Sequence, residues 1–411
     1  MTGRGATRTG ASLLVLIACA AGAQEGGVTL SFNVSQSLEA RIDDGADPVW
    51  FANTDLGFAL SSETRTQTLA LTGSTGLRAI LTEDGTETVP SDPRLRFSYD
   101  REGANSGLSV DLSLTRSDIA YIRPLQDFIV DGVFVPPEDF EDLEGEGTRL
   151  SRSLSVDLVL VREGPIGATV SFDASDLTYQ DTTAPDLVDS QRARLGVDLR
   201  FKLSDTMDAT LGLGHEIVET EGAEARETTD YRLGLSVAEP RGELTFAVFG
   251  AETDAGSRYG VEAGRSIDLP RGSLDVSVGA TRAVSGATEL TGSIDYVHEL
   301  PLGAITLSAA RGVTTTDDGE RLRTSLSAAY NQPINSLFDF GVDASYFASA
   351  DTATDVQSDT ASLGLRLGYA LSEDWSLDTV YRVSRSDETG APARTDQSLS
   401  ISLGRSFDYR F

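Results

Sequence analysis

The chain has 411 residues, with 33 basic and 64 acidic side chains and a formal net charge of −31 at pH 7. This acidic balance argues against nucleic acid as a partner, since a polyanion binds basic surfaces. A single cysteine excludes a disulfide framework or a thiolate metal site within the chain, and we expect no cofactor. Beyond the N-terminal segment, no stretch approaches the roughly 18 consecutive apolar residues of a membrane helix.

Residues 1–23 have the pattern of an export signal. Arg4 and Arg8 precede an apolar stretch at 11–18, and Ala21-Gly22-Ala23 provides small residues for cleavage. Cleavage there leaves a mature chain of 24–411 that has no cysteine and a net charge of −33.

A second processing route stays open in the same segment. Leu16-Ile17-Ala18-Cys19 resembles a lipobox, in which Cys19 would be acylated and become the first mature residue.

From residue 28 onward, the chain repeats segments of about ten residues or more in which apolar and polar side chains alternate. Examples in chain order are Val28, Leu30, Phe32 and Val34; Leu154, Val156, Leu158 and Leu160; and Leu363, Leu365, Leu367 and Tyr369. The alternation predicts strands with one apolar face. Aromatic residues on these strands nearly all share the apolar positions, with Phe249 and Phe347 as the exceptions. The alternative is a large soluble antiparallel protein with one buried face.

The connections between these segments alternate in length. Tight links with turn chemistry include Glu239-Pro240-Arg241-Gly242, Leu269-Pro270-Arg271-Gly272 and Ser372-Glu373-Asp374, and longer acidic links lie between them. The pattern predicts an all-β fold: one transmembrane, antiparallel, up-and-down β-barrel over 24–411, with short periplasmic turns and longer extracellular loops. We expect about 20 strands, and 18 is the alternative because the turn at 61–65 is weakly marked. We expect no plug and no second domain.

The polar positions of the strands carry charges of both signs, which suit a barrel interior only where water is present. We therefore predict a hydrated lumen. The candidates to line it are Arg94, Arg96, Asp111, Asp157, Asp173, Arg194, Asp198, Arg200, Arg232, Asp295, Arg323, Asp339, Asp343, Arg366 and Arg382. The other interpretation is that these charges brace the wall of a barrel that conducts nothing.

One connection, residues 118–147, is long enough to suggest a function of its own. It begins with apolar residues and passes through Pro136-Pro137 into an acidic tract. The acidic residues are Glu138, Asp139, Glu141, Asp142, Glu144 and Glu146. In length and acidity the connection resembles the inward-folded constriction loop of general porins, which implies carboxylates that narrow the bore and favour cations. The alternative is an extracellular flap whose carboxylates bind a divalent cation, although the tract lacks the Asp-x-Asp-x-Asp-Gly spacing of a calcium loop.

The last strand ends in an aromatic pattern, with Phe407, Tyr409 and Phe411 on one face and Arg405 as its only break. This pattern resembles the C-terminal signature of Gram-negative outer-membrane β-barrels. The resemblance implies location in the cell outer membrane, contact with its lipid, and recognition of the last strand by the barrel assembly machinery. It also allows a homotrimer, as in porins.

Together these patterns predict a porin-like channel for passive diffusion of small hydrophilic solutes and ions, with a cation preference indicated by the acidic charge. The alternative is a non-conducting structural or surface-binding barrel. We expect no enzymatic activity, because His215 and His298 both fall on the apolar face near strand ends and leave the serine-rich strands without a base.

Overall fold

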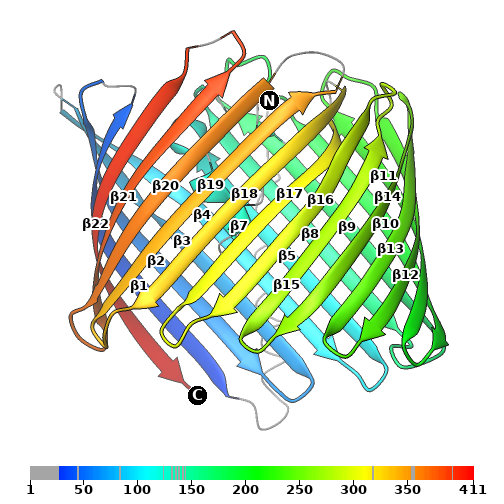
Figure 1. Ribbon diagram of the computed structural model, residues 1–411. Helices are drawn as coiled ribbons and strands as arrows, with labels where there is room; N and C mark the ends of the chain where they lie inside the picture. The colour runs from blue at the N-terminus through cyan, green and yellow to red at the C-terminus, as the bar shows by residue number, and fades with distance from the viewer. Residues whose placement is uncertain are drawn as a thin grey trace, which may run out of the picture.

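The computed structural model describes residues 27–43, 46–82, 85–123, 125–130, 133–134, 137, 139–140, 143, 145–316, 319–352, 357–390 and 392–411. Twenty strands of this part of the chain form one antiparallel sheet that closes on itself as a barrel (Figure 1). The expected export signal and the lipobox lie outside the described residues. No helix in the described part is long and apolar enough to cross a membrane.

The barrel strands run up and down in chain order. They are β1 (Val28–Asp43), β2 (Val49–Glu63), β3 (Gln67–Thr82), β4 (Gly85–Glu102), β5 (Ser106–Asp118), β8 (Thr148–Leu160), β9 (Ile166–Gln180), β10 (Ser190–Ser204), β11 (Met207–Thr220), β12 (Arg226–Glu239), β13 (Gly242–Thr253), β14 (Gly256–Leu269), β15 (Gly272–Arg282), β16 (Thr288–Glu299), β17 (Ala304–Thr316), β18 (Gly319–Pro333), β19 (Phe338–Asp351), β20 (Gln357–Ala370), β21 (Trp375–Glu388) and β22 (Arg394–Arg410). Between β5 and β8 lie two short 3₁₀ helices, η1 (Ile119–Tyr121) and η2 (Gln126–Phe128), and a small hairpin of β6 (Ile129–Val130) and β7 (Val133–Phe134).

The first and last strands close the sheet. β1 pairs with β2 on one side and with β22 on the other, where Phe32 is opposite Phe407 and Leu30 is opposite Tyr409. Every barrel strand therefore has two neighbours, and the sheet has no open edge. The expectation of an up-and-down barrel of 20 strands is confirmed. The weakly marked turn is real, since Thr64 donates its backbone N–H to Gln67 O at 2.8 Å between β2 and β3.

Alternation along each strand gives the wall two different faces. The large apolar side chains lie on the outer face and are exposed, as Leu213 (54%) and Val278 (56%) illustrate. Charged and small polar side chains occupy the opposite face, because successive side chains of a strand point to opposite sides. The barrel is therefore apolar outside and polar inside, the reverse of a soluble sandwich.

Tight turns connect consecutive strands at the barrel end where the C-terminus lies (Figure 1). β12 and β13 are joined by Pro240-Arg241, and β14 and β15 by Pro270-Arg271. Gly242 and Gly272 follow these dipeptides with φ of 126° and 148°, in the region that favours glycine. A Cβ at Gly272 would lie 1.9 Å from Val297 O, so no larger residue fits there.

Candidate functional site

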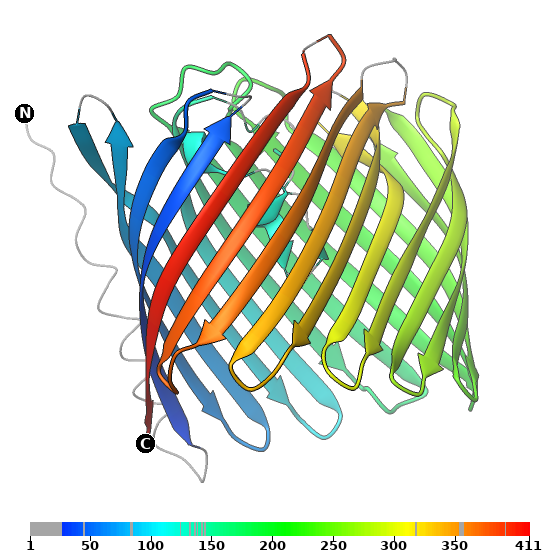
Figure 2. The ribbon, with the colours of Figure 1, turned by 60° about the vertical axis from the view of Figure 1, so that its left-hand side comes forward.

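The described residues of 119–147, called the inward segment below, lie inside the barrel instead of extending from its rim. Figures 1 and 2 both show the short elements of this segment within the ring of strands. Its described residues contact the inner side of β2, β3, β8, β9 and β19, and β7 lies against β18. The segment thus reaches walls that are far apart in the order of the sheet.

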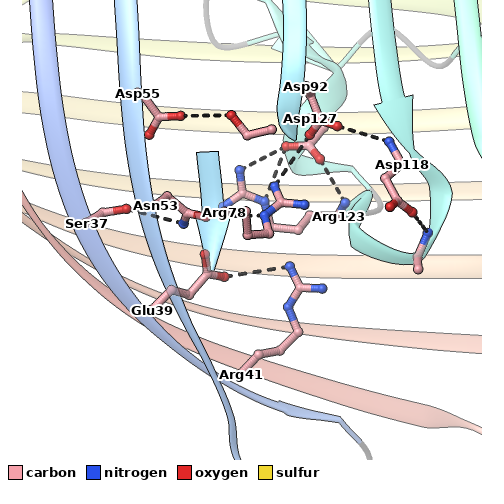
Figure 3. Close-up of polar contacts among 12 residues, drawn as sticks. Ser37, Glu39, Arg41, Asn53, Asp55, Arg78, Asp92, Asp118, Arg123 and Asp127 are labelled. Carbon is pink, nitrogen blue, oxygen red and sulfur yellow. Dashed lines mark hydrogen bonds and ion pairs between the residues drawn. The ribbon is translucent and has the colours of Figure 1, made fainter. Parts of the chain in front are cut away.

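Tyr121 attaches the beginning of the segment to the wall. Its ring meets Phe51 of β2 edge to face, with centroids 5.7 Å apart, and the guanidinium of Arg78 on β3 lies 4.6 Å from its centroid. Asn53 accepts a hydrogen bond from Arg78 Nε at 3.2 Å, and Asp92 pairs with Arg78 at 3.5 Å (Figure 3). Burial raises the pKa of Tyr121, so its hydroxyl stays neutral at ordinary pH.

Arg123 and Asp127 form an ion pair within the segment. The backbone N–H of Arg123 donates to Asp127 Oδ2 at 2.8 Å, and Arg123 Nη2 donates to Oδ1 at 3.0 Å (Figure 3). The Asp127 carboxylate raises the pKa of Arg123 above its usual value. Glu39 of β1 and Arg382 of β21 lie within electrostatic reach of this pair. Charges of alternating sign thus continue from the segment to the wall.

An apolar cluster attaches the middle of the segment to the opposite wall. Leu125 is fully buried and Phe347 of β19 is 2% exposed, with Phe128 and Phe140 packed against them. Phe140 meets Phe347 edge to face at 4.9 Å between centroids and meets Phe128 at 5.8 Å. Leu125 has a φ of 66°, a conformation that costs a non-glycine residue on the order of 1 kcal/mol and persists because the packing holds it.

A buried ion pair attaches the residue that precedes Phe140 to the wall formed by β8 and β9. Asp139 accepts two hydrogen bonds from Arg149, at 2.6 Å from Nε and 2.7 Å from Nη2. The hydroxyl of Tyr179 donates to the same carboxylate. Asp139 and Arg149 are 9% and 8% exposed, so this bidentate pair is shielded from water.

Three inward aromatic residues coincide with these attachments. The sequence identified Phe347 and Phe249 as aromatics outside the apolar positions, and both lie on the inner face: Phe347 packs on the segment, and the guanidinium of Arg232 lies 5.9 Å from the Phe249 ring. The sequence-based set of two inward aromatics was incomplete, because Phe51 and Tyr179 also point inward. Each of these two contacts the inward segment, as Phe347 does, so three of the four inward aromatics mark places where the segment docks, and Phe249 contacts Arg232 instead.

The sequence-predicted lumen residues all occupy the strand positions opposite to the exposed apolar ones, and many of them pair with one another or with a neighbour. Arg194 bridges Glu216 and Asp230, Arg366 lies 2.6 Å from Asp378 and 3.8 Å from Asp339, and Arg382 lies 3.9 Å from Asp343. Arg96 lies 3.5 Å from Asp111, Arg200 3.4 Å from Asp208, and Arg232 3.0 Å from Glu262. Ser155 and Ser308 donate hydrogen bonds to Asp173 and Asp295. Arg94, Asp157, Asp198 and Arg323 lie on the same inner face.

The exposure of these inward charges shows that the interior is not filled with side chains at their level. The side chain of Arg96 is 64% exposed, that of Arg366 is 52% exposed, and that of Asp339 is 49% exposed. Charged groups on a barrel wall that keep this much accessible surface are in contact with solvent space. The inner face at these positions is therefore accessible to water.

At the barrel end that carries the longer connections, contacts join strands that are not neighbours. Arg226 of β12 donates to the backbone oxygen of Thr316 on β17. Arg258 of β14 pairs with Glu320 of β18 at 3.3 Å, and Glu320 also accepts the backbone N–H of Val284 at 2.5 Å. A cavity of about 460 Å³ is lined by residues of both β10 and β18. The tip region of β17 and β18 thus lies close to β12 and β14, which are not its neighbours in the sheet.

The acidic tract is only partly described. Glu138, Glu141, Asp142 and Glu144 lie outside the described residues, whereas Asp139 is buried against Arg149 and Glu146 is exposed. His215 shares a hydrogen bond of 3.1 Å with Thr229, and His298 stacks on Tyr296. Within the described ranges, no group of three or more His, Cys, Asp or Glu side chains is placed to hold a metal ion.

The terminal aromatic pattern lies on the outer face of β22. Tyr409 and Phe411 are 51% and 79% exposed there, close to the barrel end with the tight turns. Arg405, which breaks the pattern, places its guanidinium 4.5 Å from the ring centroid of Phe407 and 5.3 Å from that of Trp375 on β21. The break in the apolar pattern is therefore covered by aromatic rings, an arrangement suited to a membrane interface.

Comparison with known proteins identifies the fold. No protein-family model matches this sequence, and no curated protein matches it. The siderophore receptor PirA from Acinetobacter baumannii matches with a TM-score of 0.50 and 8% identity, over 94% of this chain and 81% of that chain. The chain has the fold of an outer-membrane β-barrel. At this identity, the likeness of this outer-membrane-type barrel to PirA concerns the fold alone.

Two further solved structures resemble the barrel less closely. PirA from Pseudomonas aeruginosa matches with a TM-score of 0.48 and 11% identity, over 92% of this chain and 80% of that chain. OccAB4 from Acinetobacter baumannii matches with a TM-score of 0.39 and 10% identity, over 93% of this chain and 99% of that chain.

Proposed function

We propose that this chain is an outer-membrane channel through which small hydrophilic solutes diffuse passively, with the inward segment limiting the bore. The observation that carries the proposal is the attachment of this segment to opposite walls, by Phe140 on Phe347 and by Asp139 on Arg149. A segment held at both sides narrows the passage without closing the whole cross-section of a barrel of this strand number.

The chemistry of the two faces supports this proposal. An apolar outer face with aromatic side chains near the barrel ends suits a bilayer, which an open sheet edge could not cross. The inner face supplies exposed charges such as Arg96 and Asp339. Opposite charges along a hydrated wall orient water and polar solutes, and they offer little to an apolar substrate.

A cation preference is part of the proposal and rests on the overall charge of −31. Asp139 adds little to it, because its carboxylate is neutralised by Arg149 at 2.6 Å. Asp111 and Asp339, whose side chains are 41% and 49% exposed on the inner face, are better placed to act on a passing ion. The preference should therefore be modest. An enzymatic role gains no support from either histidine, since His215 and His298 both lie on the outer face.

The test is conductance of the full-length protein, purified in detergent and inserted into a planar bilayer, with reversal potentials measured in a salt gradient. Steady steps with a reversal potential of the sign for cations are expected. Folding of each preparation is checked by heat-modifiable migration on gels, so that silence cannot be attributed to an unfolded sample. A folded protein that gives no steps overturns the channel proposal.

The second candidate is a non-conducting structural or surface-binding barrel, and the contacts at the rim favour it. Arg226 and Arg258 tie β12 and β14 to β17 and β18, and Glu320 is 9% exposed. If these ties close the passage, Arg258→Gln should turn a silent barrel into a conducting one. If the passage is already open, the same substitution should change conductance by less than about twofold, since one contact at the rim contributes little to the total resistance.

A further inference from the structure

A hollow of about 600 Å³ opens on the outer face of the barrel, over β5, β8, β9, β10 and β11. Its apolar lining consists of the side chains of Leu112, Leu114, Leu154 and Ile217, together with the small residues Ala174 and Ala193. The proposed channel makes no use of this surface, because it lies on the wall that faces away from the lumen.

Strand parity places the hollow outside the barrel. Arg149 of β8 and Tyr179 of β9 reach Asp139, which belongs to the inward segment, so both point into the lumen. Arg152 and Asp176 occupy the opposite parity on the same two strands, because side chains alternate along a strand. Arg152 and Asp176 therefore point outward, and both line the hollow.

These two residues form an ion pair on a face whose larger side chains are mainly apolar. Arg152 Nη1 lies 2.5 Å from Asp176 Oδ2, and the side chains are 52% and 28% exposed. A charged side chain on the lipid-facing wall is costly at the bilayer centre and tolerated near the interface. Both residues lie near the strand ends that carry the longer connections, which is the side that we assign as extracellular.

The hollow has an apolar end and a polar end. Leu112 and Leu154 lie within their strands, whereas Gln191 and Glu219 lie at the extracellular ends of β10 and β11. A lipid of the outer leaflet has this polarity, with its acyl chains toward the bilayer centre and its head group toward the cell exterior.

A second arginine lies beside the polar end. In the register of β5 and β8, Leu114 is opposite Arg152 and Arg116 is opposite Leu150, so Arg116 and Arg152 are diagonal neighbours on the outer face. Asp176 engages one edge of the Arg152 guanidinium, which has five N–H donors in total. Two arginines at diagonal positions of one wall can both offer guanidinium N–H groups to a single phosphate group.

We propose that this hollow binds a phosphorylated, multiply acylated glycolipid of the outer leaflet. An acyl chain lies along Leu112 and Leu154, the small side chains of Ala174 and Ala193 make room for it, and a head-group phosphate meets Arg152 and Arg116. Asp176 holds Arg152 in place for this contact. The inference rests on the outer-membrane location proposed above and is independent of whether the barrel conducts.

The experiment is native mass spectrometry of the full-length protein in detergent, titrated with diphosphoryl lipid A and, separately, with lipid A from which the phosphates have been removed. Wild-type protein should retain the phosphorylated form, and Arg152→Gln should weaken its retention roughly tenfold, as expected for loss of a charge-assisted hydrogen bond. Ala193→Phe should fill the hollow and reduce retention of both forms. The matched control is Arg311→Gln. It removes another outward arginine, which lies in the extracellular half of β17 and has a side chain that is 46% exposed. This control should bind as wild type does.

Three results would overturn the proposal. Equal retention of phosphorylated and dephosphorylated lipid A would show that no phosphate is recognised. An equal loss in Arg152→Gln and Arg311→Gln would indicate general attraction to an arginine-bearing surface. Lipid-free dimers that disappear in Ala193→Phe would assign the hollow to a second copy of the chain. A protein that is silent in a planar bilayer but retains phosphorylated lipid A would contradict the channel and support the hollow, so the two proposals fail separately.

Discussion

The inward segment is held to the barrel in two chemically different ways. On one side, Leu125 and Phe140 pack against Phe347 of β19, and on the other, Asp139 is bound by Arg149 and Tyr179 of β8 and β9. Apolar packing supplies free energy but tolerates small shifts in position, whereas a bidentate carboxylate fixes both distance and orientation. Asp139 and Phe140 are consecutive, so a single peptide bond joins the two kinds of attachment. The ionic contact therefore fixes the position of a part of the segment that the apolar contact stabilises.

The largest effect is expected from breaking the apolar attachment. Phe347→Ala should lower the free energy of unfolding by about 4 kcal/mol, because it empties a site that is 2% exposed. Release of the segment should also raise single-channel conductance. The matched control is Phe249→Ala, which removes an inward aromatic that touches Arg232 instead of the segment. Equal conductance changes in the two variants would contradict an anchoring role for Phe347.

Breaking the ionic attachment should lower the free energy of unfolding slightly less than breaking the apolar one. It should disturb the position of the inward segment more. Asp139→Asn leaves the buried guanidinium of Arg149 without its counter-charge, which should destabilise the protein by about 3 kcal/mol. Conductance should become noisy, since the segment remains packed on Phe347 but is no longer fixed. Asp339→Asn, at a 49% exposed carboxylate of the same inner face, should leave the noise unchanged. Quiet steps in Asp139→Asn would show that the ion pair does not position the segment.

The attachment through Tyr121 combines both chemistries and should be weaker than either. Tyr121→Leu keeps part of the packing on Phe51 but removes the contact with the Arg78 guanidinium 4.6 Å from the ring. The expected loss is about 1 kcal/mol, the usual size of a cation–π contact that is partly shielded from water. Chemical unfolding in detergent measures it. A loss as large as that of Phe347→Ala would mean that the beginning of the segment, and not its middle, carries the stability.

The smallest effect is expected from salt. Raising the ionic strength to about 1 M shortens the Debye length to roughly 3 Å, which screens exposed pairs but acts little on a buried one. Exposed charges such as Arg96 and Asp111 should lose their influence on passing ions. Ion selectivity should therefore fall, while the noise of the current stays the same. An increase in noise with salt would indicate that the Asp139–Arg149 pair is open to solvent.

The sequence was sufficient for the architecture because alternation is a local signal that is repeated along the chain. Outward residues such as Leu213 and inward ones such as Asp230 follow from parity alone, and the turn chemistry at Gly242 and Gly272 separates the strands. Phe51 was missed as an inward residue because it follows Trp50, and two adjacent aromatics do not show which one faces out. Tyr179 was missed because it stands at the end of β9, beyond the clear alternation.

The attachments themselves could not be read from the sequence, since they depend on distances across the lumen. Asp139 stands in an acidic tract and looked like a free carboxylate, but it is buried against Arg149. The ties between Arg258 and Glu320 likewise require knowledge of how close β14 comes to β18. Local sequence patterns predict the strands of the wall, whereas distances across the lumen depend on how the whole ring of strands closes.

The seam between β1 and β22 has a consequence for how this protein folds. Val28 donates its backbone N–H to Phe411 O, and Phe411 donates to Val28 O at 2.9 Å, so strands at opposite ends of the described chain close the ring. Contacts this distant in sequence make folding slow, because the entropy of loop closure is lost before the contact forms. Until the seam closes, two strands expose unpaired backbone groups that hydrocarbon cannot satisfy. Closure of the ring is therefore the step at which a catalyst of insertion has the most to contribute.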